Sequence, residues 1–129
     1  LAAQAMGADF AYAGSVFIAT QECRASDAYK QGIVEGRASD IVYSSLFTGV
    51  HGNYLRGSII AAGMDPDNLP EGDPSKMDFG SGGNTDAKAW RDIWGSGQGI
   101  GAVDKVVSVA DVVARMKREY AEAKAALCG

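Results

Sequence analysis

The residues of this sequence best suited to binding an anion lie at a turn close to its start. An apolar run over residues 8–13 breaks at Gly14 and Ser15, and a second apolar run follows. A strand that leads through a small turn into a helix presents backbone N–H groups to an anion, and the helix dipole adds a favourable field. Gly14 lets the backbone come close, and Ser15 can donate its hydroxyl. The pattern predicts a phosphate-type site, with an ordinary structural turn as the alternative.

A second glycine-containing segment, residues 95–101, has glycine at every second position. Gly97, Gly99 and Ala102 fit a loose dinucleotide fingerprint, but the preceding segment has a helical pattern where that motif needs a strand. Two interpretations stay open for this loop. Its backbone passes close to a ligand, with Gln98 supplying an amide that donates and accepts, or it is a tight structural crossover with Gln98 exposed.

The other polar residues predict no metal site and no catalytic triad. His51 is the single histidine, it lies in a glycine-containing turn, and no Asp or Cys stands at a spacing that suits a triad or a metal. The proline-containing stretch over residues 64–84 has several carboxylates without the EF-hand pattern, so we expect a solvated acidic loop.

Apolar periodicity and turn residues predict the elements that position these segments. They are a helix end over residues 1–6, a strand over 9–13, a helical turn over 16–21, a helix from Ser26 to Glu35, an extended segment over 40–44, a helix over 54–62, the loop over 64–84, a helix over 86–94 and an amphipathic helix from Ser108. The last helix has one apolar face, which must dock on another surface.

Composition bounds the class of protein. The 129 residues have a net charge of −4 with scattered basic residues, which argues against a nucleic-acid or anionic-membrane surface. No apolar run approaches the roughly 20 residues that span a bilayer, and no signal peptide is visible. The two isolated cysteines predict free thiols in a reducing cytoplasm. Because the sequence opens within a helical pattern, we expect it to be part of a longer chain.

Five segments together resemble one enzyme family. Residues 8–22 (ADFAYAGSVFIATQE) resemble the eighth-strand segment of the nitronate monooxygenases, also called 2-nitropropane dioxygenases. Residues 40–43 (DIVY), 48–56 (TGVHGNYLR) and 61–66 (AAGMDP) resemble the region that follows in that family. Residues 88–101 (KAWRDIWGSGQGIG) resemble its C-terminal motif, so the resemblance covers nearly the whole chain.

The resemblance implies an α/β fold, namely the C-terminal fragment of a TIM-type (β/α)8 barrel with a small, mostly helical second domain. Residues 1–24 would then form the end of a barrel helix, the last barrel strand and a phosphate-binding turn. Residues 25–106 would form the small domain of helices and loops, and residues 107–129 the final barrel helix. The implied cofactor is FMN, with its phosphate at Ala13, Gly14 and Ser15, and with the loop that contains Gln98 crossing near the flavin.

The family also implies the activity. Its members are FMN-dependent and oxidise alkyl nitronates with O2, while a related group looks like NAD(P)H:quinone reductases, toward which residues 12–15 and 88–101 lean. The family's catalytic histidine and a Gly-Gly turn at the phosphate precede residue 1 of this sequence. His51 does not match that position, so no catalytic residue is assigned, and the rest of the barrel is the expected partner. An alternative of another class is a non-catalytic docking domain that uses the apolar stripe over residues 109–127.

Overall fold

The computed structural model describes residues 1–76 and 89–128 of the chain. The described elements, in chain order, are α1 (Ala2–Ala5), α2 (Ser15–Ile18), α3 (Asp27–Glu35), the 3-10 helix η1 (Ala38–Asp40), β1 (Ile41–Ser44), β2 (Gly52–Leu55), α4 (Arg56–Ala61), η2 (Pro74–Lys76), α5 (Ala89–Asp92), η3 (Gln98–Ala102) and α6 (Val109–Cys128). The end of the expected loop, residues 77–84, and the start of the expected helix, residues 86–88, lie outside the described residues.

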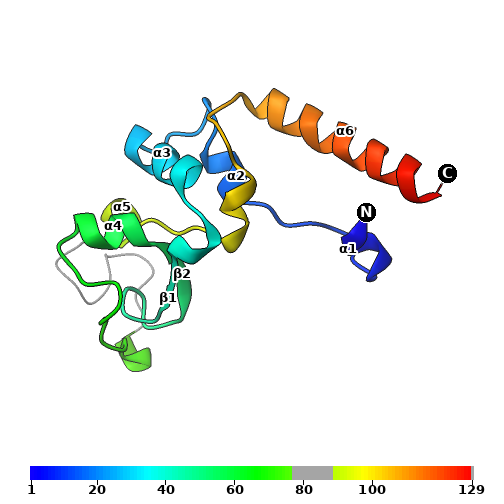
Figure 1. Cartoon of the computed structure of the whole chain (residues 1–129). Coiled ribbons are helices and arrows are strands. Elements are labelled where there is room, and N and C mark those ends of the chain that lie inside the picture. Colours follow the sequence, from blue (N-terminus) through cyan, green and yellow to red (C-terminus); the bar gives the residue numbers. More distant parts are fainter. Residues whose placement is uncertain (77–88, 129) are drawn as a thin grey trace.

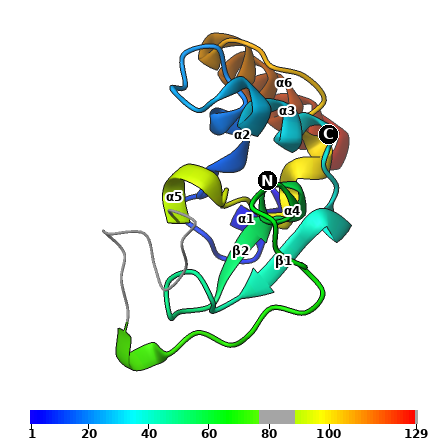
Figure 2. The same ribbon diagram turned by 90° about the vertical axis from the view of Figure 1, so that its left-hand side faces the viewer.

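Within residues 25–106, the part expected to form the small domain, β1 and β2 form a two-stranded antiparallel sheet (Figure 2). The register pairs Ile41 with Leu55 and Ser44 with Gly52. The helix expected over residues 54–62 therefore starts later, at Arg56, because Tyr54 and Leu55 belong to β2 and pair with β1. Residues 25–106 were expected to form helices and loops, and the short sheet between β1 and β2 was not predicted.

The glycine-containing loop runs along the free edge of β2. Gly95 forms an isolated antiparallel bridge with Tyr54. The Leu55 N–H donates to the Trp94 carbonyl at 2.8 Å, and the Ser96 N–H donates to the Asn53 carbonyl at 3.1 Å. β2 therefore fixes the position at which the loop enters η3.

Several predicted helix boundaries are confirmed by their caps. Ser26 accepts a hydrogen bond from the Tyr29 N–H at the start of α3, and Ser108 accepts one from the Asp111 N–H at the start of α6. Gly7, at φ 93°, closes α1 with the Gly7 N–H donating to Gln4 and the Ala8 N–H to Ala3, which is a Schellman motif. Gly63 follows α4 at φ 80°.

Two adjoining groups of buried side chains form the core. One packs around β1, β2 and α4, and the other joins α2 and α3 to η3. Their members are Leu46, Phe47, Tyr54, Ile59 and Ile93 in the first group, and Ala19, Ile33, Leu55, Ile100 and Val103 in the second. Tyr54 and Leu55 alternate between the two groups, as successive residues of a strand must.

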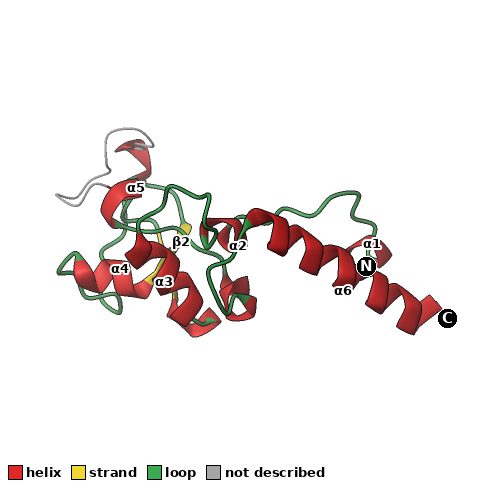
Figure 3. Ribbon diagram, turned by 90° about the horizontal axis from the view of Figure 1, so that it is seen from above, coloured by secondary structure: helices red, strands yellow, loops and turns green. Residues whose placement is uncertain are grey.

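The long helix α6 extends away from this core, with α1 beside its distal half (Figures 1 and 3). The Tyr120 hydroxyl donates to Gln4 Oε1 at 2.8 Å. At the other end, the Glu22 carboxylate accepts a hydrogen bond from the Val109 N–H at 3.0 Å, and the Gln21 N–H donates to the Val107 carbonyl. α6 is thus attached by its first turn, by the buried Val112, by the Arg115–Asp104 ion pair and by one contact with α1. Within the described residues, no helix combines the length and apolar character that crossing a bilayer requires.

The strand expected over residues 9–13 is not formed in this structure. The segment runs from α1 to α2 without regular secondary structure, and Phe10 and Tyr12 are 94% and 102% exposed (Figure 1). A strand needs a neighbour to complete its hydrogen-bond ladder. No described segment exchanges ladder hydrogen bonds with these residues.

Candidate functional site

The turn before α2 and the glycine-containing loop, far apart in sequence, line one pocket of about 510 Å3. The turn supplies residues 12–16, the loop supplies Gly95, Ser96, Gly97 and Gly99, and Asn53 of β2 lies between them. The volume is within the range of small-molecule sites. The two segments that the sequence identified separately therefore belong to one site.

Ser15 joins the two segments directly. Its Oγ accepts a hydrogen bond from the Gly97 N–H at 3.0 Å and one from the Ser96 hydroxyl at 3.2 Å. Ser96 is buried, so its hydroxyl depends on this internal partner. The Ser15 hydroxyl therefore fixes the loop, and it retains its own hydrogen for a ligand.

The turn also offers backbone donors. The Phe17 and Ile18 N–H groups both donate to the Gly14 carbonyl, which closes the first turn of α2. In the part of the chain that the structure describes, no acceptor pairs with the backbone N–H groups of Gly14, Ser15 and Val16. All three residues line the pocket, so these N–H groups can donate hydrogen bonds to an anion bound there.

Among the described residues, a side chain at any glycine of the pocket would meet at most one atom, at ordinary van der Waals distance. A Cβ at Gly14 or Gly99 would meet no atom within 4 Å, and one at Gly97 would meet only Ser15 Oγ, at 3.9 Å. Gly14 has φ −108°, which other residues also adopt. Neither packing nor backbone strain within the described residues explains Gly14, whereas a group bound against the turn would.

Gln98, predicted to contact the cofactor, is exposed and does not line the pocket. Its amide pairs with the amide of Asn53, with Gln98 Nε2 donating at 3.3 Å and Asn53 Nδ2 donating at 3.4 Å. Asn53 is the pocket residue that sequence reasoning missed. The available signal was its place between Gly52 and Tyr54, in a segment that resembles the family.

Aromatic side chains support the loop on its core side. Tyr29 of α3 stacks on Trp94, with ring centroids 5.0 Å apart, and its hydroxyl donates to the Gly95 carbonyl. Burial raises the pKa of Tyr29, and Cys23 adds to the shift, so the hydroxyl stays a donor at neutral pH. The backbone between Trp94 and Ser96 is therefore held by α3, β2 and Ser15 together.

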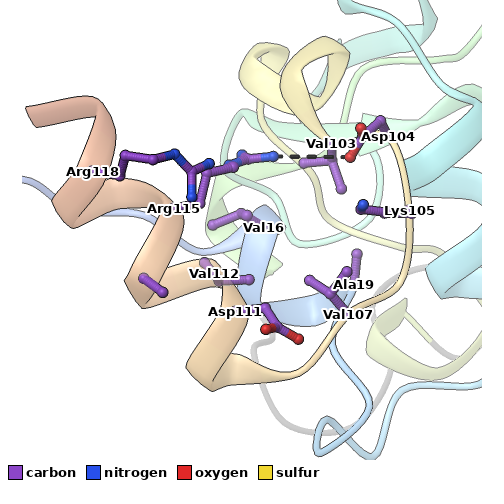
Figure 4. A pocket seen from close by; sticks show the side chains of 11 residues that line it. Val16, Ala19, Val103, Asp104, Lys105, Val107, Asp111, Val112, Arg115 and Arg118 are labelled. Carbon is purple, nitrogen blue, oxygen red and sulfur yellow. Dashed lines mark ion pairs between the residues drawn. The ribbon is translucent and has the colours of Figure 1, made fainter. Parts of the chain in front are cut away.

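A second pocket, of about 380 Å3, lies between α6, α2 and the segment after η3 (Figure 4). Arg115 crosses it toward Asp104, 3.9 Å away, and also lies 3.4 Å from Glu119. Val16 and Val112 line its apolar side. Val16 is shared with the first pocket, whereas Gly14, Ser15 and residues 95–101 do not line this one. It forms the contact between α6 and the core and is therefore not the candidate site.

The remaining candidates from the sequence do not assemble into a site. His51 is exposed and stacks on Tyr43, with ring centroids 4.7 Å apart. Asp67 of the acidic loop forms a bidentate pair with Arg56 at 2.6 and 2.8 Å. Over residues 1–76 and 89–128, no group of three or more His, Cys, Asp or Glu residues could hold a metal ion.

Comparison with known proteins supports the fold. No protein-family model and no curated protein matches the chain. A solved structure of a FabK mutant from Thermotoga maritima matches it with a TM-score of 0.66 and 22% sequence identity, over 99% of this chain and 39% of that chain. The chain is thus a mixed α/β structure that shares the fold of part of FabK, and it spans about two fifths of that protein's length.

Proposed function

We propose that this chain is part of a cytoplasmic FMN-dependent oxidoreductase resembling the nitronate monooxygenases, in which the pocket between the turn and the glycine-containing loop holds the flavin phosphate. The observation that supports this most is the convergence of the two segments on one pocket with free N–H donors and open space at Gly14.

The residues present fit a phosphate group. The backbone N–H groups of Gly14, Ser15 and Val16 would donate to its oxygens, and the Ser15 hydroxyl has one hydrogen to add. A Cβ at Gly14 would occupy the space through which the phosphate approaches the turn. Bound FMN would supply electron transfer to and from the substrate, while these residues hold and orient it.

The first test is whether the full-length protein containing this chain binds a flavin. We expect the purified protein to show flavin absorbance and to release FMN on denaturation. Purified protein that is colourless, and that does not take up added FMN, would contradict the proposal.

Two activities divide the proposal. The first is oxidation of an alkyl nitronate by O2, which the resemblance of the whole chain to the nitronate monooxygenases implies. The second is reduction of a quinone by NAD(P)H, which is implied because residues 12–15 and 88–101 are more similar to the reductase group. Oxygen consumption with propionate-3-nitronate, compared with NADH oxidation in the presence of a benzoquinone, separates them. Turnover of the nitronate without NADH oxidation eliminates the reductase.

A non-catalytic docking domain is the second candidate, and the exposed apolar side chains favour it. Phe10, Tyr12 and Leu127 are 94%, 102% and 78% exposed. In the flavoenzyme the same side chains would face the rest of the barrel. Sizing of the full-length protein together with its flavin absorbance separates the two candidates, since a colourless protein that assembles with a partner supports docking and a flavin-containing one contradicts it.

A further inference from the structure

The amides of Asn53 and Gln98 form a reciprocal pair, which couples the orientations of the two side chains. Each amide donates one N–H and accepts at its carbonyl oxygen, at 3.3 and 3.4 Å. A flip of either amide would place nitrogen against nitrogen and oxygen against oxygen. Asn53 therefore keeps one N–H and one carbonyl lone pair free for a ligand.

The two amides are not equivalent. Asn53 is partly buried in β2, pairs with Tyr43 of β1 and lines the pocket. Gln98 is exposed at the start of η3 and lies outside the pocket lining. Of the two, Asn53 is the residue positioned to meet a ligand.

Ser96 places Asn53 next to the anion-binding turn. The Ser96 N–H donates to the Asn53 carbonyl at 3.1 Å, and the Ser96 hydroxyl donates to Ser15 Oγ at 3.2 Å. One buried residue thus contacts both sides of the pocket. Asn53 and the three turn residues with free backbone N–H groups line the same cavity.

We infer that Asn53 donates its free Nδ2 hydrogen to the phosphate of the bound flavin, and that Gln98 is a positioning residue that sets the Asn53 amide. This inference rests on the proposed function. It assigns to Asn53 the ligand contact that the sequence suggested for Gln98.

Comparison of FMN with riboflavin, which lacks the phosphate, tests the assignment in the full-length apoprotein by quenching of flavin fluorescence. Asn53→Ala should weaken FMN binding about tenfold, the size expected for a hydrogen bond to a charged group, and leave riboflavin binding nearly unchanged. Asn53→Asp should weaken FMN binding further, because a carboxylate oxygen then faces the phosphate. Gln98→Ala should weaken FMN binding about threefold, and the double variant should bind FMN as Asn53→Ala does.

Gln31→Ala is the matched control, because Gln31 is an exposed glutamine whose amide pairs with Glu35 on α3. It should leave both affinities unchanged. Equal losses for FMN and riboflavin, or additive losses in the double variant, would overturn the inference while wild-type flavin binding upholds the proposed function. A wild-type protein that binds no FMN would overturn both. Since Gln98 is exposed, Gln98→Ala still provides the FMN-to-riboflavin ratio if the Asn53 variants do not fold.

Discussion

Ser15 has a structural role that can be measured apart from ligand binding. Its Oγ accepts hydrogen bonds from the Gly97 N–H and from the buried Ser96 hydroxyl. Ser15→Ala should lower the free energy of unfolding by about 1 to 2 kcal/mol, because both donors lose their acceptor. Urea unfolding measures this loss, and Ser15→Thr, which keeps the hydroxyl, is the control. An alanine variant as stable as the wild type would show that the contact contributes nothing.

Gly14 separates ligand binding from stability. A Cβ there meets no atom of the described chain, so Gly14→Ala should leave the melting temperature unchanged. It should lower FMN affinity about tenfold, since the methyl group occupies the approach to the turn. Gly101→Ala is the matched control, because a Cβ at Gly101 also meets open space and Gly101 does not line the pocket. Undiminished FMN content in the Gly14 variant would place the phosphate elsewhere.

Sequence reasoning at this scale identified the turn because Gly14 and Ser15 are recognisable from residue type alone. It predicted a cofactor contact for Gln98, which stays a prediction, and it did not single out Asn53, which lines the pocket. That pairing joins residues 45 positions apart, and no local pattern reports it. The double role of Ser15 is hidden for the same reason, since Ser96 and Gly97 meet it only after β2 has positioned the loop.

At the scale of elements, Arg56 at the start of α4 and Asp67 in the following loop form a bidentate pair. The hydrogen bonds from Arg56 lower the pKa of Asp67. A lowered carboxyl pKa in the folded state gives stability that is present at neutral pH and is lost as the pH falls through that lowered pKa. Asp67→Asn should therefore be slightly less stable than the wild type at neutral pH and equally stable in acid.

Denaturant unfolding at both pH values measures this difference, which should be small because Asp67 is largely exposed. Asp9→Asn is a suitable control, since Asp9 is exposed and contacts no charged group among the described residues. A difference between Asp67→Asn and wild type that persists unchanged in acid would show that the pair is not its source.

Helices that begin at a capping residue were predicted well from the sequence, and the pairing of strands, which joins separate segments of the chain, was not. The helices that begin after Ser26 and Ser108 follow from their caps, and both are confirmed. The apolar residues near Tyr54 and Leu55 suited a helix equally well, and only pairing with β1 decides for a strand. Residues 9–13 have the composition of a buried parallel strand, but composition cannot supply the neighbouring strand.

At the scale of the whole molecule, the open course of residues 9–13 can be tested by hydrogen exchange. In the 129-residue chain alone, we expect these amides to exchange at the rate of unstructured peptide, because no described acceptor pairs with them. In the full-length protein of the proposed function they should exchange at least about a hundredfold more slowly, as strand amides do. Rapid exchange in both proteins would contradict a barrel strand at these positions.

The pocket lining has a further consequence for binding. Every described residue that lines it is uncharged, so an anion there would be held by backbone and side-chain dipoles. Dissolved salt weakens mainly the attraction between two groups that each have a net charge. The attraction between an anion and nearby hydrogen-bond donors depends less on ionic strength. The dissociation constant for FMN should therefore change by less than about twofold between low and high salt, as fluorescence titration can show. A binding site built in this way discriminates by shape and donor geometry, and its occupancy stays nearly constant when the salt concentration of its surroundings varies.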